Sequence, residues 1–195
     1  MTIRKGEPWG AAAPKPADLV LADDDAELAQ LVARDAAGAY GLRGGDLHRS
    51  LGAPQQRDTT QRIPIDALRV RVDDHELLAV AHVVARKGWW RGALLAVLNC
   101  PYIGEWDVAP RAHPNDGRFD IVEVRAGMSL RQRLQARRRL PLGSHVPHPE
   151  IDVRTAESAT WTFDAPRGVY VDGVPRGRAT RLEVAISPDH FSIYM

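Results

Sequence analysis

The sequence predicts a mainly β chain with some helix: an antiparallel β-sandwich or open barrel with one inserted helix, after a short αβ N-terminal segment. Three observations predict this class. Apolar and polar residues alternate over much of the chain after residue 61, turn residues recur at short spacing, and helical periodicity is confined to a few stretches. Short strands separated by turns at this density are typical of sandwiches and barrels.

Composition and charge restrict the function classes. The 195 residues are 44% hydrophobic and 26% charged, as in a soluble globular protein, and the net charge of +1 gives no support for nucleic-acid binding. Cys100 is the only cysteine, which excludes an internal disulfide and a cysteine-based zinc site. Met1 to Pro16 lacks the apolar core of a signal peptide, so we expect a cytoplasmic protein. No stretch reaches the ~20 apolar residues of a membrane span, so membrane contact would be peripheral.

The N-terminal segment predicts one strand and two helices. Residues 1–17 are a Gly- and Pro-rich lead-in with little regular structure, and Leu19 to Leu21 is a short strand. The Asp23-Asp24-Asp25 run offers N-caps for a helix from about Asp25 to Ala37, and we interpret it as a solvated helix start. A short helix begins near Asp46 and ends at Gly52. The polar stretch Gln55 to Gln61 is then a loop and the boundary between two units, 1–60 and 61–195.

The second unit predicts strands around one helix. The first three strands form an antiparallel meander: Ile63 to Val72, Leu77 to Val84, and Ala93 to Leu98. Six more follow: Phe119 to Val124, Ile151 to Arg154, Thr160 to Phe163, Val169 to Val171, Leu182 to Ile186, and Phe191 to Tyr194. Asp172-Gly173 favours a hairpin turn. Ser129 caps a helix from Leu130 to Leu140, which Pro141 and Gly143 end.

Three motifs, in order, carry a family resemblance. The first spans Gly44 to Pro54, the second Asn99 to Val124, and the third Val169 to Gly177. They resemble the diacylglycerol kinase and sphingosine kinase superfamily of lipid kinases, whose N-terminal domain holds ATP on a Gly-Gly-Asp-Gly-Thr loop and whose β-rich C-terminal domain contributes the catalytic base. The resemblance implies that residues 61–195 are such a C-terminal domain.

The first motif matches the end of the family's nucleotide domain. Asp46, Arg49, Leu51, Gly52 and Pro54 coincide with it, and Gly45 stands where the family has Asn. The resemblance implies a cofactor-binding role for Gly44, Gly45, Asp46, Arg49 and Asn99. The chain has no Gly-Gly-Asp-Gly-Thr loop, however, which argues against ATP binding.

The second motif is the most specific. Its matches are Asn99, Gly104, Pro110, Ala112, Asp116, Gly117 and Asp120, with Phe119 in the Leu place. The resemblance implies a structural Mg²⁺ held by the Asp116 carboxylate and the backbone oxygens of His113 and Arg118, since Mg²⁺ prefers hard oxygen ligands. A plain Asx turn without an ion is the alternative.

The third motif lacks the catalytic residue. The family hairpin ends Asp-Gly-Glu, and its Glu deprotonates the lipid hydroxyl; here Val174 follows Asp172-Gly173. A valine accepts no proton, so general base catalysis is lost at this position.

Two further features bear on partners. Trp89 and Trp90 lie between Lys87 and Arg91, and five arginines lie between Arg131 and Arg139. An anionic membrane surface or lipid would suit both, whereas the alternatives are one core tryptophan with one that covers a strand end, and a solvated helix face. His145 and His148 have the spacing of a helical metal pair, but the prolines beside them exclude a helix. Gly143 and His145 also resemble a Gly-x-His pattern of the lipid-kinase family, which implies a structural role for His145.

We therefore expect a lipid-kinase-like protein that is non-catalytic and binds lipid or phosphate. One alternative is an active diacylglycerol or other lipid kinase that works with a separate nucleotide-binding chain or uses Asp172 as its base. The other is an interaction module that oligomerises through a sheet edge or the tryptophan surface.

Overall fold

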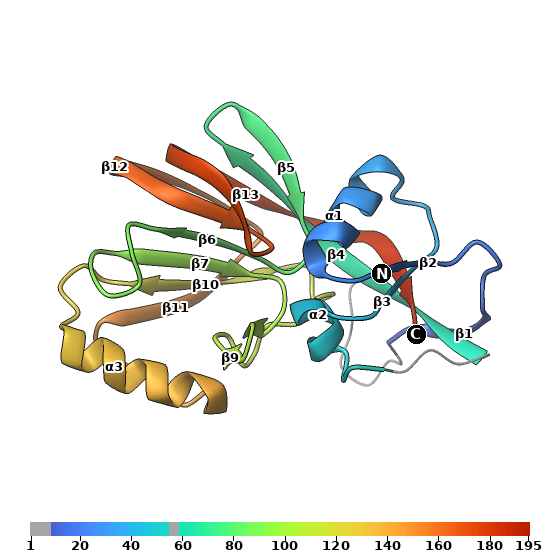
Figure 1. Ribbon diagram of the computed structural model, residues 1–195, viewed down its shortest axis with the longest axis horizontal. Coiled ribbons are helices and arrows are strands. Elements are labelled where there is room, and N and C mark those ends of the chain that lie inside the picture. Colours follow the sequence, from blue (N-terminus) through green and yellow to red (C-terminus); the bar gives the residue numbers. More distant parts are fainter. Residues whose placement is uncertain (1–8, 55–58) are drawn as a thin grey trace.

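The structure is a computed structural model that describes residues 9–54 and 59–195. A small N-terminal αβ unit lies beside a larger β body (Figure 1). The N-terminal unit contains β2 (Val20–Ala22), α1 (Asp25–Arg34), β3 (Tyr40–Leu42) and α2 (Gly45–Ser50). β2 and β3 are parallel, so β2, α1 and β3 form a βαβ unit. Asp24 caps α1, and the helix buries its apolar face, Leu28 and Val32 included.

A single open sheet of 11 strands runs through both parts, in the order β1-β4-β13-β12-β6-β7-β10-β11, with β5 beside β4, and β2 and β3 joined at β13. Its other strands are β1 (Ala11–Pro14), β4 (Thr59–Val72), β5 (His75–Ala79), β6 (His82–Arg86), β7 (Leu94–Leu98), β10 (Phe119–Val124), β11 (Ile151–Ala156), β12 (Ser158–Val171) and β13 (Val174–Tyr194). β8 (Tyr102–Ile103) and β9 (Trp106–Asp107) form a separate hairpin.

The sheet folds into two layers. β4, β5 and β13 pack against β6, β7 and β10 across a core that includes Val70, Val97 and Leu182, each almost fully buried. β12 belongs to both layers because its end, Gly168 to Val171, pairs with β6 as well as β13. The predicted antiparallel β-sandwich class is confirmed, and the sheet does not close into a barrel.

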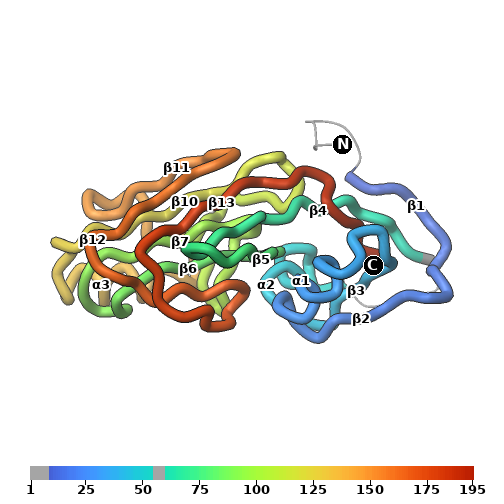
Figure 2. The backbone as a smooth tube through the Cα atoms, turned by 90° about the horizontal axis from the view of Figure 1, so that it is seen from above, coloured from blue at the N-terminus to red at the C-terminus, as the bar shows by residue number. Residues whose placement is uncertain are grey.

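The last strand joins the two parts. β13 pairs with β12 and β4 along its length and reaches β3 at its end, where Ile193 lies opposite Tyr40. Figure 2 shows it extending from the β body to the N-terminal unit. A second core forms there, in which Leu28 and Leu47 of the helices pack with Phe191.

The inserted helix covers the outer face of β6, β7 and β10. α3 (Leu130–Arg139) begins with a capping box between Ser129 and Gln132 and continues into the 3₁₀ helix η1 (Leu140–Leu142). Its polarity is unusual, because Leu130 and Leu134 are 56% and 43% exposed while Arg133 is buried. In the described part of the chain, no helix has the length and apolar character needed to cross a bilayer.

The predicted meander of three consecutive antiparallel strands is wrong, because the middle strand is divided in two. The expected strand Leu77 to Val84 is two strands, because the chain bends at Val80 and Ala81, whose backbone amides donate to the Asp172 carboxylate. β5 therefore pairs with β4, while β6 pairs with β7 and β12.

Other boundaries also differ. The lead-in contains β1, which pairs with β4, and β4 itself begins at Thr59 inside the predicted loop. Residues 1–8 and 55–58 of those predictions lie outside the described residues. α1 ends at Arg34 and not near Ala37, since Asp35 is its C-cap. The last four predicted strands are parts of the two long strands β12 and β13, because irregularities within each interrupt the apolar alternation.

Candidate functional site

The loop between β2 and α1 is closed by its own carboxylates. The Asp24 Oδ1 atom accepts a hydrogen bond from the Glu27 amide at 2.8 Å, and the Glu27 Oε2 atom accepts from the Asp23 amide at 2.7 Å. A strand-to-helix turn of this kind binds phosphate when its amides are free and its charge is positive or neutral. Here acidic side chains occupy the amides and place negative charge at the helix start.

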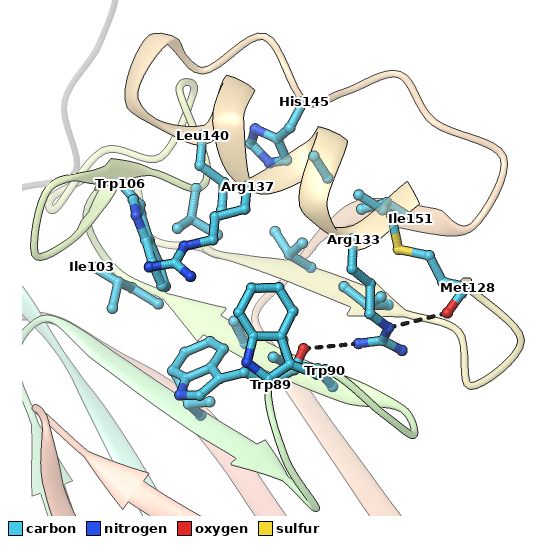
Figure 3. A pocket seen from close by; sticks show the side chains of 17 residues that line it. Trp89, Trp90, Ile103, Trp106, Met128, Arg133, Arg137, Leu140, His145 and Ile151 are labelled. Carbon is cyan, nitrogen blue, oxygen red and sulfur yellow. Dashed lines mark hydrogen bonds between the residues drawn. The ribbon is translucent and has the colours of Figure 1, made fainter. Parts of the chain in front are cut away.

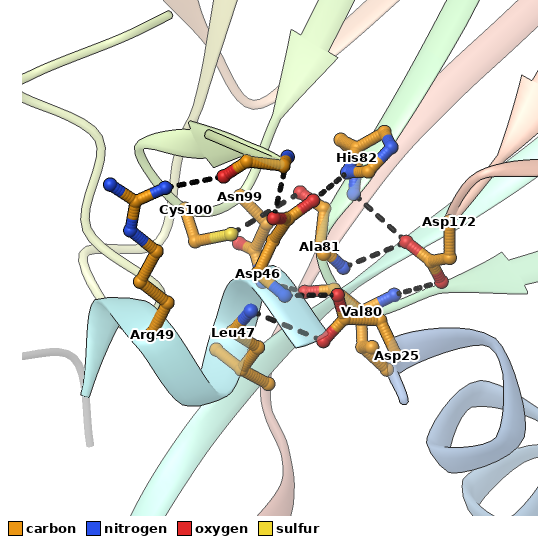
Figure 4. Close-up of polar contacts among 11 residues, drawn as sticks. Asp25, Asp46, Leu47, Arg49, Val80, Ala81, His82, Asn99, Cys100 and Asp172 are labelled. Atoms are coloured by element: carbon orange, nitrogen blue, oxygen red, sulfur yellow. Dashed lines mark hydrogen bonds and ion pairs between the residues drawn. The ribbon is translucent and has the colours of Figure 1, made fainter. Parts of the chain in front are cut away.

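Asp25 links this loop to α2 (Figure 4). Its carboxylate accepts hydrogen bonds from the amides of Asp46 and Leu47 in the first turn of α2. Burial, with a smaller contribution from the negative charge of Asp172, raises the pKa of Asp25 to about 7. Gly45 has a φ of +97°, and a Cβ there would lie 2.5 Å from Asp25 Oδ1. The Gly in the family's Asn place therefore makes room for the Asp25 carboxylate.

α2 is docked directly on the β body. The Asp46 Oδ1 atom accepts a hydrogen bond from the Gly104 amide at 2.8 Å, and its Oδ2 atom lies 3.3 Å from His82 Nδ1. The guanidinium of Arg49 donates to the Gly104 carbonyl and stacks 4.1 Å from the centre of the Tyr102 ring. The segment from Gly44 onward thus contacts the β body through its own side chains.

Asp172 lies close to the contact between α2 and the β body, which we call the junction (Figure 4). Its buried carboxylate accepts hydrogen bonds from three consecutive amides, those of Val80, Ala81 and His82, at 2.9–3.0 Å. Burial raises its pKa, and the neighbouring His82 and the three amides partly oppose that shift. The carboxylate is therefore fixed at the β5–β6 bend.

Asn99 is buried on the other side of the same bend. Its Nδ2 atom donates to the backbone oxygens of Asp66 and Val80, at 2.8 and 2.9 Å. The structure thus brings Asp46 and Arg49 together at Gly104, while Asn99 joins β4 to the bend. A cofactor role for these residues, with Gly44 and Gly45, stays a prediction.

The turn before β10 is built around two carboxylates. Asp116 Oδ1 accepts from the Arg118 amide at 3.0 Å, which is an Asx turn. Asp66 organises the same turn, because it accepts from Asn115 Nδ2 and from the Gly117 amide. Burial, followed by repulsion from Asp116, raises the pKa of Asp120 to about 6.

The carboxylates of this turn are of the kind that binds a magnesium ion. Two neighbouring carboxylates with raised pKa values, Asp116 and Asp120, are hard oxygen donors that a cation would stabilise, so the residues fit. No group of three or more His, Cys, Asp or Glu side chains able to hold a metal occurs within the described ranges. An ion here would therefore rely on backbone oxygens, as predicted for His113 and Arg118, and on water. The His113 ring packs against Trp9, with ring centres 4.5 Å apart.

A second site, absent from the sequence predictions, lies beneath α3. A cavity of about 280 Å³ separates the helix from β6, β7 and β10 (Figure 3). Its floor contains Val84, Ala96 and Val122, which lie opposite one another on adjacent strands. The small side chain of Ala96 between two valines leaves the hollow. The lining is mainly apolar with a few polar side chains, which is typical of a ligand pocket.

Three tryptophans surround the mouth of this cavity. Trp89 and Trp90 lie in the bend between β6 and β7 and are 39% and 40% exposed, so neither is the expected core residue. Trp106 of β9 meets Trp89 edge-on at 5.4 Å. Arg137 of α3 lies over the rings of Trp90 and Trp106, at 5.2 and 5.7 Å.

Two other polar side chains line the cavity. Arg133 is buried and donates to four carbonyls, those of Met128, Trp89, Gly92 and Arg125. The arginines of α3 are thus not one solvated face. His145 is 3% exposed, and neither ring nitrogen makes a well-formed hydrogen bond within the described residues. Burial lowers its pKa, and the backbone of Val108 partly opposes that shift.

Sequence reasoning missed the roles of Asp25 and His82, as well as the cavity. The Asp23-Asp24-Asp25 run was interpreted as a solvated cap, although its place between a strand and a helix is that of a phosphate loop. No local pattern marks Ala96 or Arg137 as cavity residues, because strand pairing and the placement of α3 create that space.

Comparisons with known proteins agree with this architecture. The family model described as the YegS C-terminal NAD kinase beta sandwich-like domain matches residues 60–195. Three solved structures described under the name diacylglycerol kinase, from Bacillus anthracis str. Sterne, have TM-scores of 0.68, 0.64 and 0.67 at 14%, 15% and 12% identity. The alignments cover 90% of this chain and 77%, 75% and 77% of those chains. At such identities they show a shared fold. No curated protein sequence matches significantly.

Proposed function

Since this chain belongs to the family of the YegS C-terminal NAD kinase beta sandwich-like domain, we propose that it is a non-catalytic, lipid-kinase-like protein that binds the apolar chain of a lipid beneath α3. The observation that carries this proposal is the cavity of about 280 Å³. Its apolar walls favour an apolar ligand, because burying such a ligand removes apolar surface from water.

The β2–α1 loop supports the absence of catalysis. Transfer of a phosphoryl group depends on positioning and neutralising phosphates. At this loop the amides of Asp23 and Glu27 are bonded to carboxylates. Asp25 occupies the first-turn amides of α2 as well. Nucleotide phosphates would meet negative charge and few free donors.

The β12–β13 hairpin supports the same conclusion. Val174 stands where the family has its base, and the nearby carboxylate of Asp172 is buried and accepts three amide hydrogen bonds. A general base must reach the proton that it removes. Asp172 would have to leave three donors to do so.

The exposed side of α3 supports peripheral contact with an anionic membrane. Leu130 and Leu134 are exposed and, with Trp90, line a shallow groove that adjoins the cavity. α3 contains no acidic residue, and four of its five arginines are exposed. Apolar side chains with a cationic rim suit an interface between headgroups and acyl chains. A bound Mg²⁺ at Asp116 belongs to the proposal as a structural ion.

The proposal is tested by lipid binding and by kinase assay of the full chain. We expect a fluorescent fatty acid to bind the wild type. Ala96→Leu, which fills the cavity floor, should weaken binding at least about tenfold, since it removes room for about three carbons. Ala33→Leu, at an exposed position of α1 away from the cavity, is the matched control and should bind normally. Thermal unfolding checks that both variants fold.

Two results would overturn the proposal. Equal binding by wild type and Ala96→Leu would place the lipid elsewhere. Transfer of phosphate from ATP to diacylglycerol by the purified chain, alone or with a nucleotide-binding partner chain, would show an active kinase.

A further inference from the structure

The mouth of the cavity carries an arginine with no acidic partner. Arg137 is exposed, and within the described residues no carboxylate lies within ion-pair distance of it. Its guanidinium lies over the faces of Trp90 and Trp106. Stacking on two rings orients the guanidinium and leaves its N–H donors available at the rim. Figure 3 shows it between α3 and the tryptophans.

The second arginine of the cavity serves as an internal contrast. Arg133 is buried, and its donors point to four backbone carbonyls. It ties α3 to the β6–β7 bend and has little capacity to bind a ligand. Of the two arginines that line the cavity, Arg137 therefore carries the positive charge that a ligand can reach. Outside the lining, Arg86 lies between the rings of Trp89 and Tyr170, at 4.3 and 4.5 Å, and Arg138 and Arg139 lie farther along α3.

The charged side chains that line the cavity, Arg133 and Arg137, are both positive. None of the residues that surround the cavity is acidic. His145, at the Leu140 end of the space, has a lowered pKa because it is buried, which favours a neutral ring near pH 7. The site thus presents an apolar interior and a cationic rim.

The size of the cavity limits the number of chains. A cavity of about 150 Å³ accepts one benzene ring, so 280 Å³ has room for roughly eleven carbon atoms. That is most of one medium-length acyl chain and less than two.

From the rim charge and the volume we infer that the ligand is a single-chain amphiphile with an anionic headgroup, a carboxylate or a phosphate. Its chain lies in the cavity and its headgroup binds the Arg137 guanidinium. This inference rests on the proposed lipid binding. A two-chain lipid exceeds the volume, and a long-chain amine would be repelled by Arg137.

The test uses four ligands with the same twelve-carbon chain: dodecanoate, dodecyl phosphate, dodecanol and dodecylamine, each below its micellar concentration. Titration calorimetry on the full chain should show the two anions binding at least about tenfold tighter than the alcohol, since a hydrogen bond to a charged group contributes more than one to a neutral group. The amine should bind weakest. A stronger response to the phosphate points to a lysophospholipid source, and a stronger response to the carboxylate to a free fatty acid.

Variants of Arg137 test whether its side chain binds the ligand headgroup. Arg137→Gln should reduce the affinity for both anions to that of dodecanol and leave dodecanol unchanged. Arg137→Lys keeps the charge and should retain a preference for anions. Arg138→Gln, an exposed neighbour without a ring contact, is the matched control and should bind as the wild type does.

The outcomes separate the two proposals. If dodecanol and the anions bind equally well, or if Arg137→Gln changes nothing, the headgroup inference is wrong while lipid binding stands. If no ligand binds the wild type, or if Ala96→Leu binds all of them normally, the proposed function itself fails.

Discussion

The junction around Asp172 and the cavity beneath α3 differ in how their charged groups are bound. In the junction, carboxylates accept hydrogen bonds from amides, as with Asp172 and its three amides or Asp25 and the first turn of α2. At the cavity, the exposed guanidinium of Arg137 stacks on two tryptophan rings and forms no ion pair with a carboxylate of the described residues. The buried ring of His145 makes no well-formed hydrogen bond within those residues, which also holds for Asn99 Oδ1 in the junction. The charged group that can still bind a ligand is therefore Arg137 at the cavity.

This difference adds a structural role to the expectation from family resemblance. The resemblance implies a cofactor role for the motif around Asp46, which stays a prediction, and in the structure the same motif fastens two parts of one chain together. The cavity is formed by α3 and the β6–β7 bend, which the motifs do not include, together with Trp106 and Val122 of the second motif. Four experiments test the difference between the two regions.

The largest effect is expected for Asp172→Ala. It leaves three buried amides without an acceptor, at about 1–3 kcal/mol each, so the free energy of unfolding should fall by about 3–9 kcal/mol in urea denaturation. Asp73→Ala is a matched control: Asp73 also has a positive φ and accepts from two amides, those of Thr180 and Arg181, but in an exposed turn. Its loss should be about 1 kcal/mol. Equal losses would contradict a special role for the junction.

The next effect is the pH dependence of stability due to Asp25. Its folded pKa of about 7 lies above the ordinary 3.8, so between about pH 4 and pH 7 the folded state holds a proton that the unfolded state has lost. Stability should therefore fall as pH rises through this window, by an amount on the order of 3–4 kcal/mol.

Asp25→Asn isolates that contribution. Other carboxyls with raised pKa values, such as Asp120, add to the wild-type slope, so the informative quantity is the difference between variant and wild type. Denaturation at pH 4, 5.5 and 7 should give a flatter profile for Asp25→Asn, while the exposed turn variant Asp74→Asn keeps the wild-type slope. Parallel profiles for Asp25→Asn and wild type would contradict the assignment.

A smaller effect is expected at the wall of the cavity. Arg133→Met removes the donor shared by four carbonyls and should lower the free energy of unfolding by about 2–3 kcal/mol. Arg131→Met, exposed on the same helix, should change it by less than about 0.5 kcal/mol. Similar values for the two variants would mean that Arg133 does not hold the β6–β7 bend.

The smallest effect concerns the turn before β10. If Mg²⁺ binds there, millimolar Mg²⁺ at ten times its dissociation constant should stabilise the protein by about 1.4 kcal/mol, a rise of about 3–6 °C in Tm. Asp116→Ala should remove this rise, and the exposed control Asp164→Ala should keep it. A rise that survives in Asp116→Ala would move the ion elsewhere.

Local chemistry explains which elements were predictable. Asp24 caps α1 and Ser129 caps α3 as expected, since both caps depend on residues within one turn. The alternation of apolar residues predicted most strands and the sandwich class. It failed at Val80 and Ala81, because the bend there depends on Asp172, about 90 positions away in the chain.

Residue type and short-range spacing were enough to establish the class of fold, the helix starts, and the absence of a glycine-rich phosphate loop and of a base at Val174. Three other features depend on the folded arrangement: Asp25 and Asp172 hold the junction closed, Arg133 is buried while Leu130 and Leu134 are exposed, and Ala96 leaves a hollow beneath α3. These outcomes depend on which strands become neighbours and on where the helix rests. Such long-range packing has no counterpart in the local pattern.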